Sequence, residues 1–361
     1  MREVKVSASV KVALIGCGAV ARLFYAPALM ELEKLGLAEV VSFADPSQDA
    51  REVIAKSFRR AKDSAGMEAA LKAGAELAIV ASPPRLHREH AELALRAGVD
   101  VLCEKPMAGS VNDCEAMIFT AERMGRMLAV GHYKRFFPNH RLLKHLIVRQ
   151  PFGALQMVEI QEGGKFGWPA LSDSFFRKEQ TPGGVLLDIG VHVLDLLLWW
   201  LGEPVEFSYQ DDVLDGLEAN AFLHASFSND VAATVRLSRD WGTLNTYTFR
   251  FESATVHLRV NQANQAEISL NGLPMTIAGE LRERVEMDYP RQTAPLESNP
   301  QAFVAQLVDV IGAIRDKRPP LVPGTEAVRA IRWIEKCYES RRPLPMPRAQ
   351  EDLREGQCGL E

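Results

Sequence analysis

Two ionisable side chains, Asp188 and His192, lie four residues apart in a stretch made almost entirely of Val, Leu, Ile and Trp. On a helix this spacing places both on one face, with Asp195 a further turn along. Buried ionisable groups must be paired or shift their pKa, and such groups in a cleft are candidates for catalysis. The spacing alone leaves two interpretations open: a core histidine satisfied by a neighbouring carboxylate, or an acid–base pair at a reactive site.

A lysine, Lys105, follows the strand-like run 99–103 and precedes Pro106. On its own it could be an exposed residue at a strand end. In parallel sheets, however, ligands bind outside the carboxyl ends of the strands. The segments Ser82-Pro83 and Glu104-Lys105 both fall at such ends, which makes them candidates for ligand contact.

A glycine-rich turn, GCGAVA, follows the apolar run 11–15 and opens a helical stretch over 19–34. In this GxGxxA pattern Gly16 permits a tight turn, Gly18 lets the backbone approach a pyrophosphate, and Ala21 lets helix and strand pack closely. The helix N-terminus at Ala19 and Val20 offers unpaired N–H groups to phosphates. The pattern predicts dinucleotide binding, although a plain strand–helix turn has the same form.

The second strand-like run, 39–44, ends at Asp45. An acid at this place hydrogen-bonds a ribose 2′-hydroxyl and repels a 2′-phosphate, so the sequence favours NAD over NADP. The alternative is that Asp45 is simply a turn residue in the Asp-Pro-Ser sequence.

Strand and helix patterns divide the chain into two parts. Alternating strand-like and helical runs predict an α/β class with an N-terminal Rossmann domain, a doubly wound parallel sheet, over residues 1–132. Strand-like runs joined by short turns such as Asn229-Asp230 and Asn271-Gly272 then predict an α+β substrate domain over 133–345, with a largely antiparallel open sheet. Residues 346–361 are Pro-rich, then charged, and predict a flexible tail. The predicted strands are 11–15, 39–44, 77–81, 99–103 and 127–130 in the first domain, and 155–162, 218–227, 231–239, 247–252, 255–260 and 266–270 in the second.

Composition excludes several classes of protein. The 361 residues carry 42 basic and 47 acidic side chains, a net charge of −5, so we expect no nucleic-acid partner. Five scattered cysteines without metal-ligand spacing predict free thiols, no metal and a cytoplasmic location. The most apolar window, 185–201, is interrupted by charged residues and predicts a buried helix with no membrane partner.

Several longer strings resemble the glucose-fructose oxidoreductase / inositol dehydrogenase / MocA (Gfo/Idh/MocA) family. They are SPPRLHREHAELALRAGVDVLCEKPM with its EKP tripeptide, GHYKRFFP, and GGVLLDIGVHVLDLLLWWLGEP with its D-x-x-x-H motif. The resemblance covers about residues 10–345. The chain departs from it at Pro84, where members commonly carry Asn, and at Tyr133 and Lys134.

The resemblance implies roles for particular residues. His192 would be the general base, Lys105 would stabilise the developing alkoxide, and Asp188 would orient substrate or catalytic groups. Cofactor contacts are expected from Gly16, Gly18, Ala19, Val20, Asp45, Ser82, Pro83, His87, Glu104 and Lys105. Substrate contacts are expected from Lys105, Tyr133, Arg135, Lys165, Trp168, Arg177, Asp188 and His192.

The function that follows is hydride transfer between NAD(P) and a secondary hydroxyl or ketone of a sugar, nucleotide-linked sugar or cyclitol. Two alternatives remain: a redox-neutral glycosidase that uses NAD transiently, and a non-catalytic dinucleotide-sensing regulator. Intact Lys105, Asp188 and His192 argue against the regulator. As the family commonly has, we expect a homodimer or homotetramer assembled through the C-terminal sheet.

Overall fold

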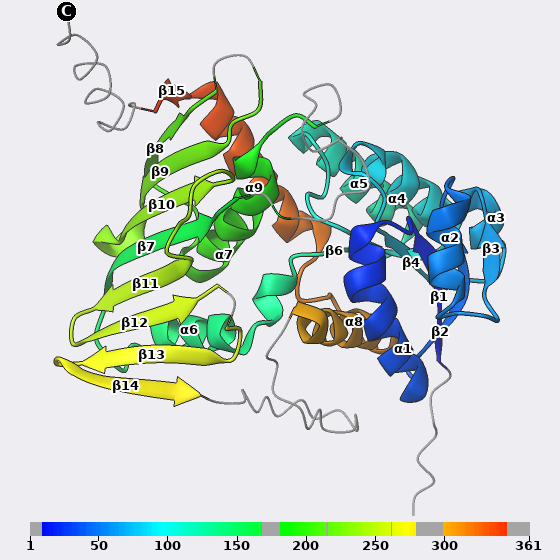
Figure 1. Cartoon of the computed structure of the whole chain (residues 1–361), viewed down its shortest axis with the longest axis horizontal. Coiled ribbons are helices and arrows are strands. Elements are labelled where there is room, and N and C mark those ends of the chain that lie inside the picture. Colours follow the sequence, from blue (N-terminus) through cyan, green and yellow to red (C-terminus); the bar gives the residue numbers. More distant parts are fainter. Residues whose placement is uncertain are drawn as a thin grey trace, which may run out of the picture.

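The computed structural model describes residues 9–165, 167, 181–213, 216–260, 262–278 and 299–344. Over these ranges the chain forms two sheet-based units lying side by side, with helices between them (Figure 1). The predicted α/β class is confirmed: one sheet is wholly parallel and doubly wound, and the other is largely antiparallel.

Six parallel strands form the first sheet, in the order β3-β2-β1-β4-β5-β6. Their bounds are Val10–Ile15, Ala38–Ala44, Lys62–Ser64, Leu77–Val80, Asp100–Cys103 and Leu128–Val130 for β1 to β6. Strand β4 is buried at every residue, as expected where helices cover both faces. The order reverses between β1 and β4, the topological switch point where ligands bind in such sheets.

Helices α1 (Ala26–Lys34) and α2 (Gln48–Ala55) cover one face of this sheet. Helices α3 (Met67–Leu71), α4 (His87–Arg96) and α5 (Val111–Met124) cover the other. The expected continuous helix over 19–34 differs in detail, because a π-helical turn, Ala21–Tyr25, precedes α1. Single π-helical turns occur frequently at functional sites.

The second sheet has the strand order β14-β13-β12-β11-β7-β10-β9-β8-β15. The strands are β7 (Leu155–Gly163), β8 (Glu206–Asp211), β9 (Asn220–Ser226), β10 (Ala232–Ser238), β11 (Thr246–Phe251), β12 (Ala254–Arg259), β13 (Gln265–Leu270), β14 (Leu273–Ala278) and β15 (Arg342–Pro343). Positive φ angles at Asn229, Asp230, Asn271 and Gly272 confirm both predicted tight turns. The sheet is mixed rather than uniformly antiparallel, because β7 pairs parallel with β10.

Helices α6 (Pro138–Arg149), α7 (Val191–Leu201) and α9 (Gly324–Glu339) lie on the face of this sheet turned toward the first unit (Figure 1). Alternate residues of β9, β10 and β11 are buried beneath them, as the period of two predicts. Helix α7 is buried along most of its length, so the apolar window is a core helix. No helix in the described ranges has the length and apolarity needed to cross a membrane.

The chain returns to the first unit near its C-terminal end. Helix α8 (Asn299–Asp316) packs against α1, and its residues Phe303 and Leu307 belong to the same apolar cluster as Leu29. A bridge between Pro323 and Ala129 joins β6 to the start of α9. The division at residue 132 therefore stays a prediction, and the predicted tail at 346–361 lies outside the described residues. Four cysteines, Cys17, Cys103, Cys114 and Cys337, are buried free thiols, and Cys358 lies beyond the described ranges.

Candidate active site

A cavity of about 870 Å³ opens at the switch point of the first sheet, between the two units. The first unit contributes the glycine-rich turn and the loops after β4 and β5, including Ser82 and Lys105. The second unit contributes Glu162 from the end of β7, and Asp188 and His192 from the start of the α7 segment. The volume is within the range of small-molecule and cofactor sites.

The glycine-rich turn has the geometry that its sequence predicts. Gly16 has φ +95°, and a Cβ there would lie 2.6 Å from the Ala81 carbonyl, so only glycine fits. A Cβ on Gly18 would meet nothing within 4 Å, and Gly18 lines the cavity. A side chain at residue 18 would therefore project into space that a pyrophosphate could fill.

Asp45 hydrogen-bonds to the glycine-rich turn and also lines the cavity. Its Oδ2 accepts a hydrogen bond from the Cys17 N–H at 2.8 Å, and its Oδ1 accepts one from the Ser47 N–H at 2.9 Å. The second contact is the local turn that the alternative interpretation of Asp45 requires. Both interpretations are compatible with this geometry, because a carboxylate oxygen can accept more than one hydrogen bond.

The loops after β4 and β5 are joined by a buried histidine. The two ring nitrogens of His87 lie 2.8 Å from the carbonyl oxygens of Pro106 and Ser82, and burial lowers the pKa of His87 to about 4. Buried Glu104 accepts a hydrogen bond from the Tyr25 hydroxyl at 2.6 Å, and burial raises the pKa of this carboxyl group. His87 and Glu104 thus fix the loops that present Lys105.

Lys105, Asp188 and Arg239 form an ion-paired group in the cavity. The Lys105 Nζ lies 3.0 Å from Asp188 Oδ1 and 2.9 Å from the Asp188 carbonyl oxygen. The Arg239 guanidinium donates to Asp188 Oδ2 at 2.8 Å. Burial alone would raise the pKa of Asp188, but the two cations hold it below its usual value. Asp188 is therefore a carboxylate that fixes the Lys105 ammonium in place.

His192 is held by rings rather than by a carboxylate. Its ring centroid lies 5.0 Å from that of Tyr133 and 5.9 Å from that of His132, both edge to face. Its Nδ1 is sealed from solvent with no hydrogen-bond partner among the described residues, and the residue lines the cavity. Burial, followed by the charge of Lys105, lowers the pKa of His192 well below 6.5. A neutral imidazole that lines a cavity can accept a proton from a bound hydroxyl group.

Asp188 and His192 both line the cavity, from a locally distorted helical segment and from the helix that follows it. The segment Leu186–Gly190 is a π-helical turn that runs into α7. No described hydrogen bond joins Asp188 to His192, because both carboxylate oxygens of Asp188 face Lys105 and Arg239. The two residues are therefore not the satisfied core pair that the spacing alone left open.

Comparison with known proteins identifies the family. Residues 10–132 match the profile "Oxidoreductase family, NAD-binding Rossmann fold", and residues 140–257 match "GFO/IDH/MocA C-terminal domain". The chain belongs to the Gfo/Idh/MocA oxidoreductase family. The predicted resemblance is thereby confirmed.

Two relatives of this Gfo/Idh/MocA family member are sugar dehydrogenases by name. D-glucoside 3-dehydrogenase of Escherichia coli is 31% identical over 207 residues, 56% of this chain and 57% of that protein. Glucose-6-phosphate 3-dehydrogenase of Bacillus subtilis is 32% identical over 200 residues, 54% of each chain. The chain thus spans little more than half the length of these two relatives. A levoglucosan dehydrogenase solved with NADH and levoglucosan has TM-score 0.80 at 16% identity, covering 92% of this chain and 97% of that one, and it shows the shared fold.

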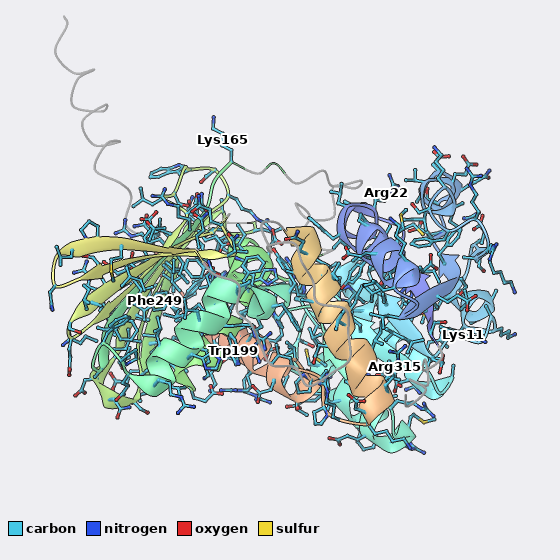
Figure 2. All side chains as sticks on the ribbon, turned by 90° about the horizontal axis from the view of Figure 1, so that it is seen from below. Lys11, Arg22, Lys165, Trp199, Phe249 and Arg315 are labelled. Carbon is cyan, nitrogen blue, oxygen red and sulfur yellow. The ribbon has the colours of Figure 1, made fainter. Side chains whose placement is uncertain are left out.

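The residues of this family member that are expected to contact substrate differ in where they lie. Tyr133 lines the cavity, stacked on Phe303 with centroids 5.0 Å apart. Lys165 lines its rim and extends into solvent (Figure 2). Trp168 and Arg177 lie outside the described residues.

Arg135 is a buried residue that pairs with a carboxylate of α7. Its guanidinium forms two hydrogen bonds to Asp195, at 2.7 and 2.8 Å, and both side chains are only 2% exposed. Arg135 is absent from the described lining of the cavity, and it neutralises a buried carboxylate. Its expected contact with substrate stays a prediction.

The residues that line the cavity but were not expected from the sequence include three charged ones, Lys134, Glu162 and Arg239. The sequence did contain a sign that Glu162 is paired, because it follows Val158 and Ile160 at the inward positions of β7. A charge at an inward position of an amphipathic strand is unusual unless it is paired. At Lys134 the sequence shows only a departure from the family pattern.

Proposed function

We propose that this protein is an NAD-dependent oxidoreductase that transfers a hydride between nicotinamide and a secondary hydroxyl or ketone group of a sugar or cyclitol. The observation that carries the proposal is the meeting, in one cavity, of the glycine-rich turn with Lys105 and His192. The names of the relatives support the same class of reaction.

The described residues fit the cofactor. The open space at Gly18 would receive the pyrophosphate, and Asp45 would hold the ribose hydroxyl groups. Ser82 and Pro83 after β4 would border the nicotinamide half. When bound, NAD supplies the hydride acceptor for the oxidation.

The chain's own residues then handle the proton and the charge on oxygen. Nε2 of His192 accepts the hydroxyl proton as the carbon–hydrogen bond breaks. The Lys105 ammonium donates a hydrogen bond to the same oxygen and stabilises its developing negative charge. Asp188 keeps Lys105 oriented, and the low pKa of His192 keeps its imidazole neutral and able to accept the proton at pH 7.

Two further expectations belong to this proposal. The outer face of the second sheet would form the interface of a homodimer or homotetramer. The buried free thiols support a reducing, cytoplasmic location.

The test is direct. The purified protein would be analysed by mass spectrometry for retained nucleotide, and then mixed with NAD and a panel of sugars and cyclitols. Reduced-nicotinamide absorbance with at least one panel member supports the proposal. No absorbance with any member, with the protein folded and NAD bound, contradicts it.

A further inference from the structure

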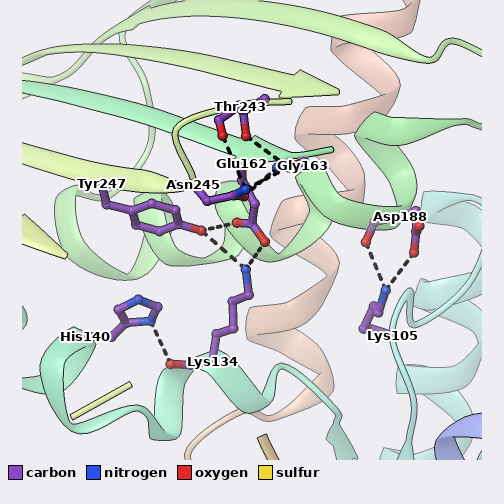
Figure 3. Close-up of polar contacts among 9 residues, drawn as sticks. All are labelled: Lys105, Lys134, His140, Glu162, Gly163, Asp188, Thr243, Asn245 and Tyr247. Carbon is purple, nitrogen blue, oxygen red and sulfur yellow. Dashed lines mark hydrogen bonds and ion pairs between the residues drawn. The ribbon is translucent and has the colours of Figure 1, made fainter. Parts of the chain in front are cut away.

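A second lysine–carboxylate pair lines the same cavity, apart from Lys105 and Asp188 (Figure 3). The Lys134 Nζ lies 2.5 Å from Glu162 Oε1, and these side chains are 5% and 11% exposed. The Tyr247 hydroxyl donates to Glu162 Oε2 from behind the pair. The hydride-transfer chemistry proposed above gives these three side chains no contact with substrate, although the charge of Lys134 contributes to the low pKa of His192.

Two separate segments of the chain hold the Lys134–Glu162 pair in position. Glu162 precedes Gly163, where Asn245 bonds both the N–H and the carbonyl group at 2.9 Å. Gly163 has φ +133°, and a Cβ there would lie 1.9 Å from the Ser238 carbonyl oxygen, so the backbone of β7 can approach β10 only with glycine. On the other side, the Lys134 carbonyl lies 3.0 Å from Nδ1 of His140.

Counting donors and acceptors shows what the pair offers to a ligand. The Lys134 ammonium has three N–H groups and two described partners, Glu162 and, at 3.4 Å, the Tyr247 hydroxyl. One N–H is left for the cavity. Burial and then the charge of Glu162 raise the pKa of Tyr247, so the phenol remains protonated and donates to Glu162. Each Glu162 oxygen accepts one hydrogen bond and can accept another.

A group entering here meets one donor, spare acceptor capacity and no net charge. A hydroxyl group both donates and accepts, so it satisfies Lys134 and Glu162 together. A carboxylate or phosphate only accepts hydrogen bonds, so it cannot satisfy Glu162, and a pair without net charge does not offset the cost of desolvating an anion. An ammonium group only donates, so it cannot satisfy Lys134, and the cost of desolvating its charge is likewise not offset.

We propose that the Lys134–Glu162 pair binds a second, non-reacting hydroxyl group of the substrate and selects neutral polyols over sugars that are anionic at that position. This inference rests on the proposed function, since Lys105 and His192 define the reacting hydroxyl. It deepens that function by naming the substrate class: a ring with two separated hydroxyl groups, uncharged where it meets the pair.

The test compares methyl β-D-glucoside with its 2-, 4- and 6-deoxy derivatives on wild-type protein and on the double variant Lys134→Met/Glu162→Gln. Removing both charges avoids leaving one buried ion unpaired. In the wild type, the loss of one particular hydroxyl should lower kcat/KM about 10- to 100-fold, the range for hydrogen bonds to charged groups. In the double variant the loss of that hydroxyl should no longer lower kcat/KM, while the effects of removing the other hydroxyls should remain. Glu159→Gln is the matched control, because Glu159 lies on the same strand but pairs with exposed Arg250 outside the cavity.

A second comparison uses the anionic sugar methyl β-D-glucuronoside. Wild-type protein should discriminate against it, and Glu162→Gln alone should narrow that discrimination, because the repelling charge is gone and Lys134 remains. Equal deoxy-sugar penalties in wild type and double variant would overturn the inference, as would unchanged discrimination against the glucuronoside in Glu162→Gln.

Binding measurements distinguish a failure of this inference from a failure of the proposed function. Calorimetry of the same sugars against NADH-saturated protein reads the subsite without turnover. If the sugars bind with the predicted coupling but are never oxidised, the hydride-transfer proposal fails and the subsite stands. If oxidation occurs without the coupling, or no sugar of the series binds, the subsite proposal fails.

Discussion

The buried pair of Arg135 and Asp195 offers a sharp test of how the site is supported. Arg135→Met removes a guanidinium that makes two hydrogen bonds to a carboxylate with 2% exposure. Asp195 would then be left beside His132, whose Nδ1 is 3.8 Å away, without its strong partner. Removing one member of a buried pair costs about 3 to 5 kcal/mol. Since a whole domain is stable by about 5 to 15 kcal/mol, this is a large share.

The assay is urea unfolding followed by circular dichroism, together with KM for whichever sugar is oxidised. Arg135→Met should lower the free energy of unfolding by about 3 to 5 kcal/mol. The double variant Arg135→Met/Asp195→Leu should recover most of the loss, because apolar residues of similar size can replace a buried pair. KM in the double variant should stay near the wild-type value. A small loss of stability with a large rise in KM would refute this account and return Arg135 to the substrate site.

Two predictions concern the cofactor. Asp45→Ala should narrow the preference for NAD over NADP about 10- to 100-fold, since a charge-assisted hydrogen bond to ribose is lost and a 2′-phosphate is no longer repelled. Calorimetry measures the two cofactor affinities. Tighter binding of NADP than of NAD to the wild-type protein would overturn the predicted preference. Gly18→Val should abolish dinucleotide binding with the fold intact, because a side chain there points into open cavity; undiminished NAD affinity in calorimetry would make the turn merely structural.

The first sheet could be predicted from sequence because its interior strands are short apolar runs between helical segments. Strand β3 escaped because its residues, Lys62–Ser64, are polar and lie at the sheet edge. In the second sheet β8 (Glu206–Asp211) was missed for a related reason: its exposed positions are polar and its sequence begins with Glu. The parallel pairing of β7 with β10 was not predictable, since local patterns say nothing about which distant strand a run will join.

The site was predictable where chemistry follows from short motifs. The glycine turn, Lys105 and the pair Asp188 and His192 all meet in the cavity. The pairing of Arg135 with buried Asp195 was not predicted, because a motif shows that an arginine is present without showing whether it faces ligand or core. Glu162 and Tyr247 come together across 85 residues of chain, so only the folded sheet reveals them as neighbours.

The central claim is that His192 and Lys105 act on one substrate oxygen. The measurement that tests it is kcat and NAD affinity across pH for wild type, His192→Ala and Lys105→Ala, on a sugar found by the panel. Each variant should lose about 10²- to 10⁴-fold in kcat with NAD affinity nearly intact, because both groups act in the transition state. The base must be neutral, and burial places the pKa of His192 well below 6.5. Wild-type oxidation should therefore be level around pH 7 and fall only on the acid side, and that acid limb should vanish in His192→Ala. Near-normal turnover in either variant, or an unchanged acid limb in His192→Ala, would contradict the account.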